Sequence, residues 1–270
     1  MDHILVILNR TETARSLLAV AGLLLGKFPG SHLDLLHPRP DIDPDYMPTE
    51  EMMSEARHQA FETERDTLYQ QLEQAVTGSS SQAKRRVLRQ VCGSVRSAVA
   101  AEAARAQLVL AGVAPRRGYS EAKDTIEAVL FDAGSPLLLV PETIPNRIGH
   151  NIAVAWEGSQ AADEAIKAAM PFLLGADLVV ILVAPDRHAS ADLPGGMVDA
   201  LAQQGRSAEV RRFELGGREI GDAILAEAGA AGADLLVMGA FTRLRTLEAL
   251  FGGATREILA GTDIPLLLHH

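Results

Sequence analysis

The sequence is poor in aromatic residues and cysteine and has no long apolar run. Only 4% of its 270 residues are aromatic while 47% are hydrophobic, so any core must be built from Leu, Val, Ile and Ala. The single cysteine, Cys92, allows neither an internal disulfide nor a cysteine zinc site, and a lone cysteine is usually a small buried or half-buried hydrophobe. No apolar run approaches the ~20 residues that span a bilayer. We therefore expect no membrane partner and a reducing, cytoplasmic location.

A surplus of positive charge is also missing. The formal net charge is −10, and the only basic cluster is Lys84, Arg85 and Arg86 with Arg89. Proteins that bind DNA or RNA contact phosphate through clustered Lys and Arg. We interpret this short cluster as a solvated strand edge and predict no nucleic-acid partner.

Several signatures of catalysis are absent. The chain has neither a phosphate-binding P-loop sequence nor a Gly-x-Ser-x-Gly nucleophile turn, and its eight histidines follow no metal-ligand spacing. Paired carboxylates such as Glu50 and Glu51 lie in a polar segment with Arg57 and Arg65, which is typical of a solvated, ion-paired helix face. We predict no catalytic residue, no metal site and no enzyme activity.

The sequence does contain a repeat: the same order of strand and helix patterns occurs in both halves. In each half, short apolar runs alternate with helical patterns and the half ends on an apolar run; the runs are 4–8, 32–36, 86–91, 107–112 and 135–141, then 151–156, 176–183, 209–213, 233–239 and 263–268. Near-continuous apolar runs of this length are typical of parallel strands buried on both faces. Alternation with helices indicates right-handed crossovers and one sheet in each half, joined by a linker at 141–149.

The two halves differ between their second and third strands, where the first half has about twice as much chain. An acidic helical pattern from Thr49 to about Val76 fills the extra length, and Gly78 to Ser81 follows as a loop by composition. Met52 and Met53 near its start are candidates for a protein-binding surface, although methionines more often pack into a core.

The ends of the two halves resemble a known family. Residues 235–241 (LLVMGAF), 250–259 (LFGGATREIL) and 263–268 (DIPLLL) are similar to the end of a universal stress protein domain. Residues 108–112 and 128–140 resemble a second, more divergent copy. The likeness covers nearly the whole chain as two tandem domains.

The resemblance implies a fold and an arrangement. Each half should be a doubly wound α/β domain of the adenine nucleotide alpha hydrolase-like kind, with a five-stranded parallel sheet in the order 3-2-1-4-5; we place the domains at 1–143 and 149–270. Domains of this family pair through their last strands, so the halves should form an internal pseudodimer, with a further homo-oligomer or protein partner as an additional expectation. Composition and periodicity alone predict two doubly wound α/β domains and nothing about their function.

The resemblance also implies a nucleotide site, for ATP or a related nucleotide, in the second half. The family loop reads Gly, two residues, Gly, nine residues, Gly, then Ser or Thr; glycines let backbone amides approach phosphates, and a helix N-terminus adds its positive end. Glu157 stands about where family binders carry an Asp, and the backbone of Val183 would face adenine. The candidate residues are Glu157, Val183, Gly239, Thr242, Gly252, Gly253 and Thr255.

This match is partial. Thr242 replaces the second glycine and Gly253 replaces the Ser or Thr. A structural role that involves no ligand explains the same residues, because Gly252 and Gly253 could form a tight turn while Thr255 caps the last helix.

The first half keeps only Gly112 of the loop and has Asp132 and Ala133 where the second half has its glycine pair. A carboxylate facing phosphate would repel it, so we predict no nucleotide in the first half.

Three functions remain in competition. The leading hypothesis is a stress-response binding or regulatory module, tuned by nucleotide in the second half. The alternative is a ligand-free structural pseudodimer that works through protein contacts. The third is a slow nucleotide hydrolase, for which Glu157 is the only obvious base.

Overall fold

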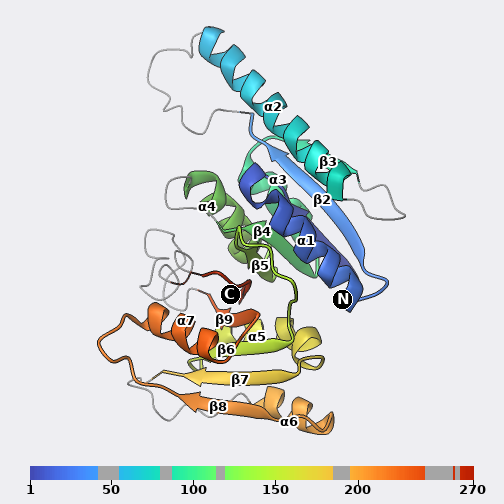
Figure 1. Ribbon diagram of the computed structural model, residues 1–270. Coiled ribbons are helices and arrows are strands. Elements are labelled where there is room, and N and C mark those ends of the chain that lie inside the picture. The colour runs from blue at the N-terminus through green and yellow to red at the C-terminus, as the bar shows by residue number, and fades with distance from the viewer. Residues whose placement is uncertain (42–54, 80–86, 114–118, 185–194, 241–257, 259–261) are drawn as a thin grey trace.

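The strands of the protein form one continuous sheet in the computed structural model (Figure 1). The structure describes residues 1–41, 55–79, 87–113, 119–184, 195–240, 258 and 262–270. Ten strands lie within these ranges: β1 (His3–Ile7), β2 (His32–Arg39), β3 (Leu88–Cys92), β4 (Leu108–Gly112), β5 (Leu137–Val140), β6 (Asn151–Trp156), β7 (Leu178–Val183), β8 (Ala208–Arg212), β9 (Leu235–Gly239) and β10 (Leu266–His269).

The order of the strands confirms the predicted fold class. Across the sheet the strands run β3-β2-β1-β4-β5-β10-β9-β6-β7-β8, so each half has the order 3-2-1-4-5 counted in its own chain direction. Within each half all neighbouring strands are parallel.

The two halves join through their last strands, as the sequence predicted. Strand β10 runs antiparallel to β5, with Leu268 opposite Leu137 and Leu266 opposite Leu139. These side chains are fully buried. Because each last strand covers the other's open edge, neither half leaves an apolar edge exposed at this seam.

Helices cover both faces of the sheet. One face carries α1 (Thr11–Lys27), α2 (Glu55–Ser79), α5 (Gln160–Leu173) and α6 (Gly195–Gln203); the other carries α3 (Val95–Ala103), α4 (Tyr119–Glu127), the single π-helical turn η1 (Ala128–Asp132) and α7 (Ile220–Ala230). Each face holds one apolar core that continues across the seam from the first half to the second.

Contacts beyond the seam also join the halves near the amino ends of the strands. The rings of Phe28 and Phe172 meet edge to face with their centroids 5.1 Å apart. Lys27 Nζ donates a hydrogen bond of 2.7 Å to the carbonyl oxygen of Gly149. Two of the few aromatic side chains therefore meet where the end of α1 in one half lies beside the end of α5 in the other.

Some local expectations were wrong. Helix α2 continues through Gly78 to Ser79, where composition predicted a loop, and α6 was not predicted because its first residues are a glycine pair. Cys92 is exposed on the outer strand β3 instead of buried or half-buried. None of the described helices is long and apolar enough to cross a membrane.

Helix α2 is polar over most of its surface and extends beyond the sheet (Figure 1). Its buried residues are Phe61, Arg65, Leu72 and Val76. Met52 and Met53, the predicted partner-binding pair, lie outside the described residues, as do Lys84, Arg85 and Arg86 of the basic cluster.

Candidate functional site

The carboxyl edge of the second half brings together the candidate residues that the structure describes. Strands β6 and β9 are neighbours there, and the chain leaves them in opposite directions along the sheet, which makes this edge the topological switch point where doubly wound folds bind ligands. Glu157 follows β6, Val183 ends the neighbouring β7, and Gly239 ends β9. The other four candidates, Thr242, Gly252, Gly253 and Thr255, lie outside the described residues.

Three consecutive residues lead from β6 into α5 at this edge. Gly158 adopts a φ of +74°, which turns the chain toward the helix. Ser159 is the N-cap of α5: its Oγ accepts a hydrogen bond of 3.1 Å from the amide of Ala162 and donates one of 3.1 Å to Glu157 Oε1. The exposed Glu157 carboxylate is therefore held beside the start of the helix.

The N-terminus of α5 has the chemistry of an anion site. The first amides of a helix have no intrahelical acceptor, and the helix dipole places partial positive charge at this end. The Ser159 cap uses one of these amides, that of Ala162. Ser159 is not among the residues predicted from the sequence, although a serine directly before an alanine-rich helical pattern is a capping signal.

Gly239 is required by packing at this edge, whatever the ligand. A Cβ on Gly239 would lie 2.5 Å from the amide nitrogen of Ala162 and 2.7 Å from the carbonyl carbon of Ala161. Gly112 ends β4 in the same way, where a Cβ would lie 2.6 Å from Cβ of Thr13 in α1. The first glycine of the predicted loop therefore lets β9 approach α5 in the second half, and Gly112 lets β4 approach α1 in the first.

Val183 lies at the edge with its backbone partly engaged. It is half-buried, pairs with Trp156 of β6, and its carbonyl oxygen accepts a long hydrogen bond of 3.4 Å from the amide of Phe213. Because Val183 pairs with Trp156, it lies next to β6, the strand that leads to Glu157.

The same edge carries different residues in the first half. Ile4 lies opposite Leu108, four residues before Gly112, just as Ile152 lies opposite Leu235, four residues before Gly239, so Leu8 corresponds to Trp156 and the half-buried Asn9 takes the place of Glu157. Leu8 is fully buried, and His37 Nδ1 donates a hydrogen bond of 2.8 Å to its carbonyl oxygen.

His37 is itself buried, and burial is the main reason that its pKa lies below the ordinary value for histidine. Arg10 stands at the N-cap of α1 and makes no side-chain cap hydrogen bond. The first half therefore lacks both the carboxylate and the capping hydroxyl of the second.

Asp132 contributes to the first half in a way the sequence did not reveal. Its two carboxylate oxygens accept hydrogen bonds of 2.5 Å and 2.8 Å from Nε and Nη2 of Arg96, and Arg96 Nη1 donates one of 2.5 Å to Glu127. The hydrogen bonds from Arg96 hold the pKa of Asp132 below its usual range. Asp132 thus fixes the end of η1 to α3.

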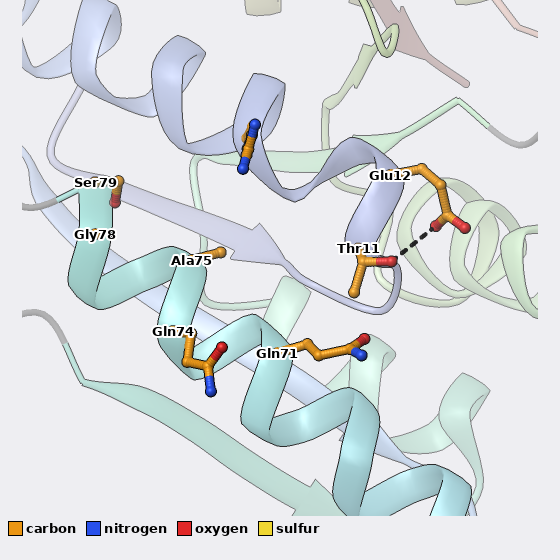
Figure 2. A pocket seen from close by; sticks show the side chains of 8 residues that line it. Thr11, Glu12, Gln71, Gln74, Ala75, Gly78 and Ser79 are labelled. Carbon is orange, nitrogen blue, oxygen red and sulfur yellow. Dashed lines mark hydrogen bonds between the residues drawn. The ribbon is translucent and has the colours of Figure 1, made fainter.

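The first half also has an open groove between α1 and α2 (Figure 2). Its lining is mostly amide, hydroxyl and small side chains, with one acidic and one basic residue: Thr11, Glu12, Arg15, Gln71, Gln74, Ala75, Gly78 and Ser79. This balance of charge does not favour a phosphate. In the described part of the chain, no cluster of His, Cys, Asp or Glu could hold a metal ion.

Comparison with known proteins identifies the second half. Residues 149–270 match the model of the universal stress protein family. This half of the chain is a universal stress protein domain. No curated protein matches the chain.

Solved structures share the fold of the whole chain, and one of them is a universal stress protein. That protein, from Archaeoglobus fulgidus DSM 4304, is similar over 99% of this chain and 97% of its own, with a TM-score of 0.68 at 14% identity. A functionally unknown protein from Pseudomonas aeruginosa PAO1 is similar over 100% of this chain and 92% of its own, with a TM-score of 0.56 at 17% identity. The strand order and the seam between the halves fit a tandem arrangement of two domains of this fold.

Proposed function

We propose that the protein is a tandem universal stress protein, with domains at 1–143 and 149–270, that acts in the cytoplasm as a stress-response binding or regulatory module. Its second domain binds ATP or a related nucleotide, and the first domain binds none. The proposal includes no catalytic role.

The observation that supports it is the contrast between two equivalent edges of one sheet. In the second half an exposed carboxylate, a glycine with positive φ and a capping serine surround the N-terminus of α5. In the first half the half-buried amide Asn9 stands in place of the carboxylate, and Arg10 at the N-cap of α1 makes no side-chain cap hydrogen bond. Of the two edges, only the second combines a carboxylate with a side-chain cap at the start of a helix.

Each described group has a role in this proposal. The carboxylate of Glu157 accepts hydrogen bonds from ribose hydroxyls, as it accepts one from Ser159 in the structure. The start of α5 favours the negative phosphates. Val183 offers backbone to adenine, while Thr242, Gly252, Gly253 and Thr255 complete the phosphate side.

A ligand-free pseudodimer is the second candidate, and one observation favours it. Gly239 is explained by helix packing alone, and the equivalent Gly112 is kept in a half that lacks the carboxylate and the capping serine. A slow hydrolase, the third candidate, requires Glu157 as its base.

Calorimetric titration of the full chain with ATP and Mg²⁺ tests the proposal. We expect a micromolar Kd with one site per chain, lost in Gly252→Asp because the new carboxylate repels phosphate. The matched control is Gly22→Asp, which places the same charge at an exposed position of α1 with open space around it. Absence of binding at millimolar ATP contradicts nucleotide binding and favours the ligand-free pseudodimer.

Phosphate release separates binding from hydrolysis. We expect no ATP turnover by the wild type above the rate without protein. Turnover that is present in the wild type and lost in Glu157→Gln would instead support the hydrolase.

A further inference from the structure

A residue of the first half contacts the carboxyl edge of the second. Phe131, in η1, meets the ring of His270 edge to face, with centroids 4.7 Å apart and planes at 78°. Both side chains are half-buried. Figure 1 shows the chain end marked C between α4 and β5 of the first half and β9 of the second. This contact therefore crosses the seam at the carboxyl end of β10, which lies beside the amino end of β5.

His270 in turn holds the end of β9. Its Nδ1 donates a hydrogen bond of 3.0 Å to the carbonyl oxygen of Ala240, and the amide of Ala240 donates one of 2.7 Å to the carbonyl oxygen of His269. Ala240 directly follows Gly239, which lies against the start of α5. A shift of His270 would therefore move the strand end that meets this helix.

The other end of the connection is anchored in the first half. Arg96 on α3 binds Asp132, the last residue of η1, through two hydrogen bonds, and binds Glu127 immediately before η1. A planar guanidinium that bridges two carboxylates fixes direction as well as distance. Phe131 is thus presented by a turn that is tied at both ends.

We propose that Phe131 of the first half is a positioning residue for the nucleotide edge of the second half. It acts through His270 on Gly239 and Ala240, so the half without a ligand sets the affinity of the half with one. The effect on affinity rests on the proposed nucleotide binding; the effect on the strand end does not. The ligand is the same nucleotide, and what is new is its control from across the seam.

The first measurement is amide hydrogen exchange at Ala240 in the full chain without ligand. We expect Phe131→Leu to speed exchange about two- to tenfold, the range that corresponds to the loss of one aromatic pair. His270→Phe keeps a ring against Phe131 but removes the Nδ1 donor, and should speed exchange to a similar degree. It also tests the connection if Phe131→Leu folds poorly.

The matched control is Phe28→Leu. It makes the same substitution in the other edge-to-face contact between the halves, which lies near the amino ends of the strands. We expect it to lower thermal stability as Phe131→Leu does, but to leave exchange at Ala240 unchanged.

The second measurement is the Kd for ATP with Mg²⁺. We expect Phe131→Leu to raise it about two- to tenfold and Phe28→Leu to leave it unchanged. The double variant Phe131→Leu/His270→Phe should bind no more weakly than the weaker single variant, because both changes break one connection.

The outcomes separate the two proposals. If the wild type binds no ATP, nucleotide binding fails while exchange at Ala240 still decides whether Phe131 positions the strand. Unchanged exchange in Phe131→Leu, or equal changes in Phe28→Leu, overturns the inference. Faster exchange with an unchanged Kd also overturns it, because the strand end would then not set affinity.

Discussion

Replacement of Gly239 by alanine should destabilise the protein even when no nucleotide is present. The new Cβ would lie 2.5 Å from the amide nitrogen of Ala162, about 0.9 Å inside the 3.4 Å at which ordinary contact begins. The opposing atoms are backbone, so no rotamer change relieves the overlap. Either α5 or β9 must move, and Ala162 belongs to the buried face of α5.

The cost of such overpacking is typically about 1–3 kcal/mol. For a chain of this size that corresponds to a fall in Tm of roughly 2–12 °C. Urea unfolding without nucleotide measures the change in free energy directly. Gly112→Ala should have the same sign, because its Cβ would overlap the buried side chain of Thr13.

Gly22→Ala is the matched control. Gly22 is exposed in the interior of α1, and a Cβ there meets nothing within 4 Å. The same substitution should therefore stabilise the protein by about 1 kcal/mol, the difference in helix propensity. If Gly239→Ala is as stable as the wild type and loses only nucleotide binding, Gly239 serves the ligand and our packing argument is wrong.

Two further predictions concern stability. Phe172→Ala should cost about 3–5 kcal/mol in urea unfolding, because its fully buried ring packs against Phe28 across the two halves; a loss below about 1 kcal/mol would contradict this core. Burial alone would raise the pKa of Asp34, but hydrogen bonds and charge from His3 and His32 outweigh it and lower the pKa below 3.8. Stability from Asp34 is therefore present above that pH and lost as the pH falls through the folded-state pKa, so Asp34→Asn should flatten this part of the urea midpoint's pH profile; an unchanged profile would refute the assignment.

Much of the fold could be predicted because its signals are local. Apolar runs such as Ile4–Leu8 indicate strands buried on both faces, and their alternation with helices leaves few topologies. The seam followed from the resemblance to a family, and β5 and β10 pair as expected. The structure differs from the prediction where local sequence signals are weak, as in α6, which begins with a glycine pair that does not favour a helix.

The candidate site could be predicted only in part. The sequence placed Glu157, Val183 and Gly239 at strand ends, and parallel strands bring such ends to one edge. It could not distinguish a glycine kept for phosphate from one kept for packing, because the atoms opposite Gly239 belong to α5, many residues away.

The sequence by itself determined two doubly wound α/β halves, since periodicity and turn chemistry are properties of neighbouring residues. Only the tertiary structure decided which groups meet across long separations. It pairs Arg96 with Asp132, bonds His37 to the carbonyl oxygen of Leu8, and sets Phe131 of one half against His270 of the other. The first two contacts depend on how the elements of the first half pack and the third on how the halves join at the seam, and no local pattern encodes distances between residues so far apart in the chain.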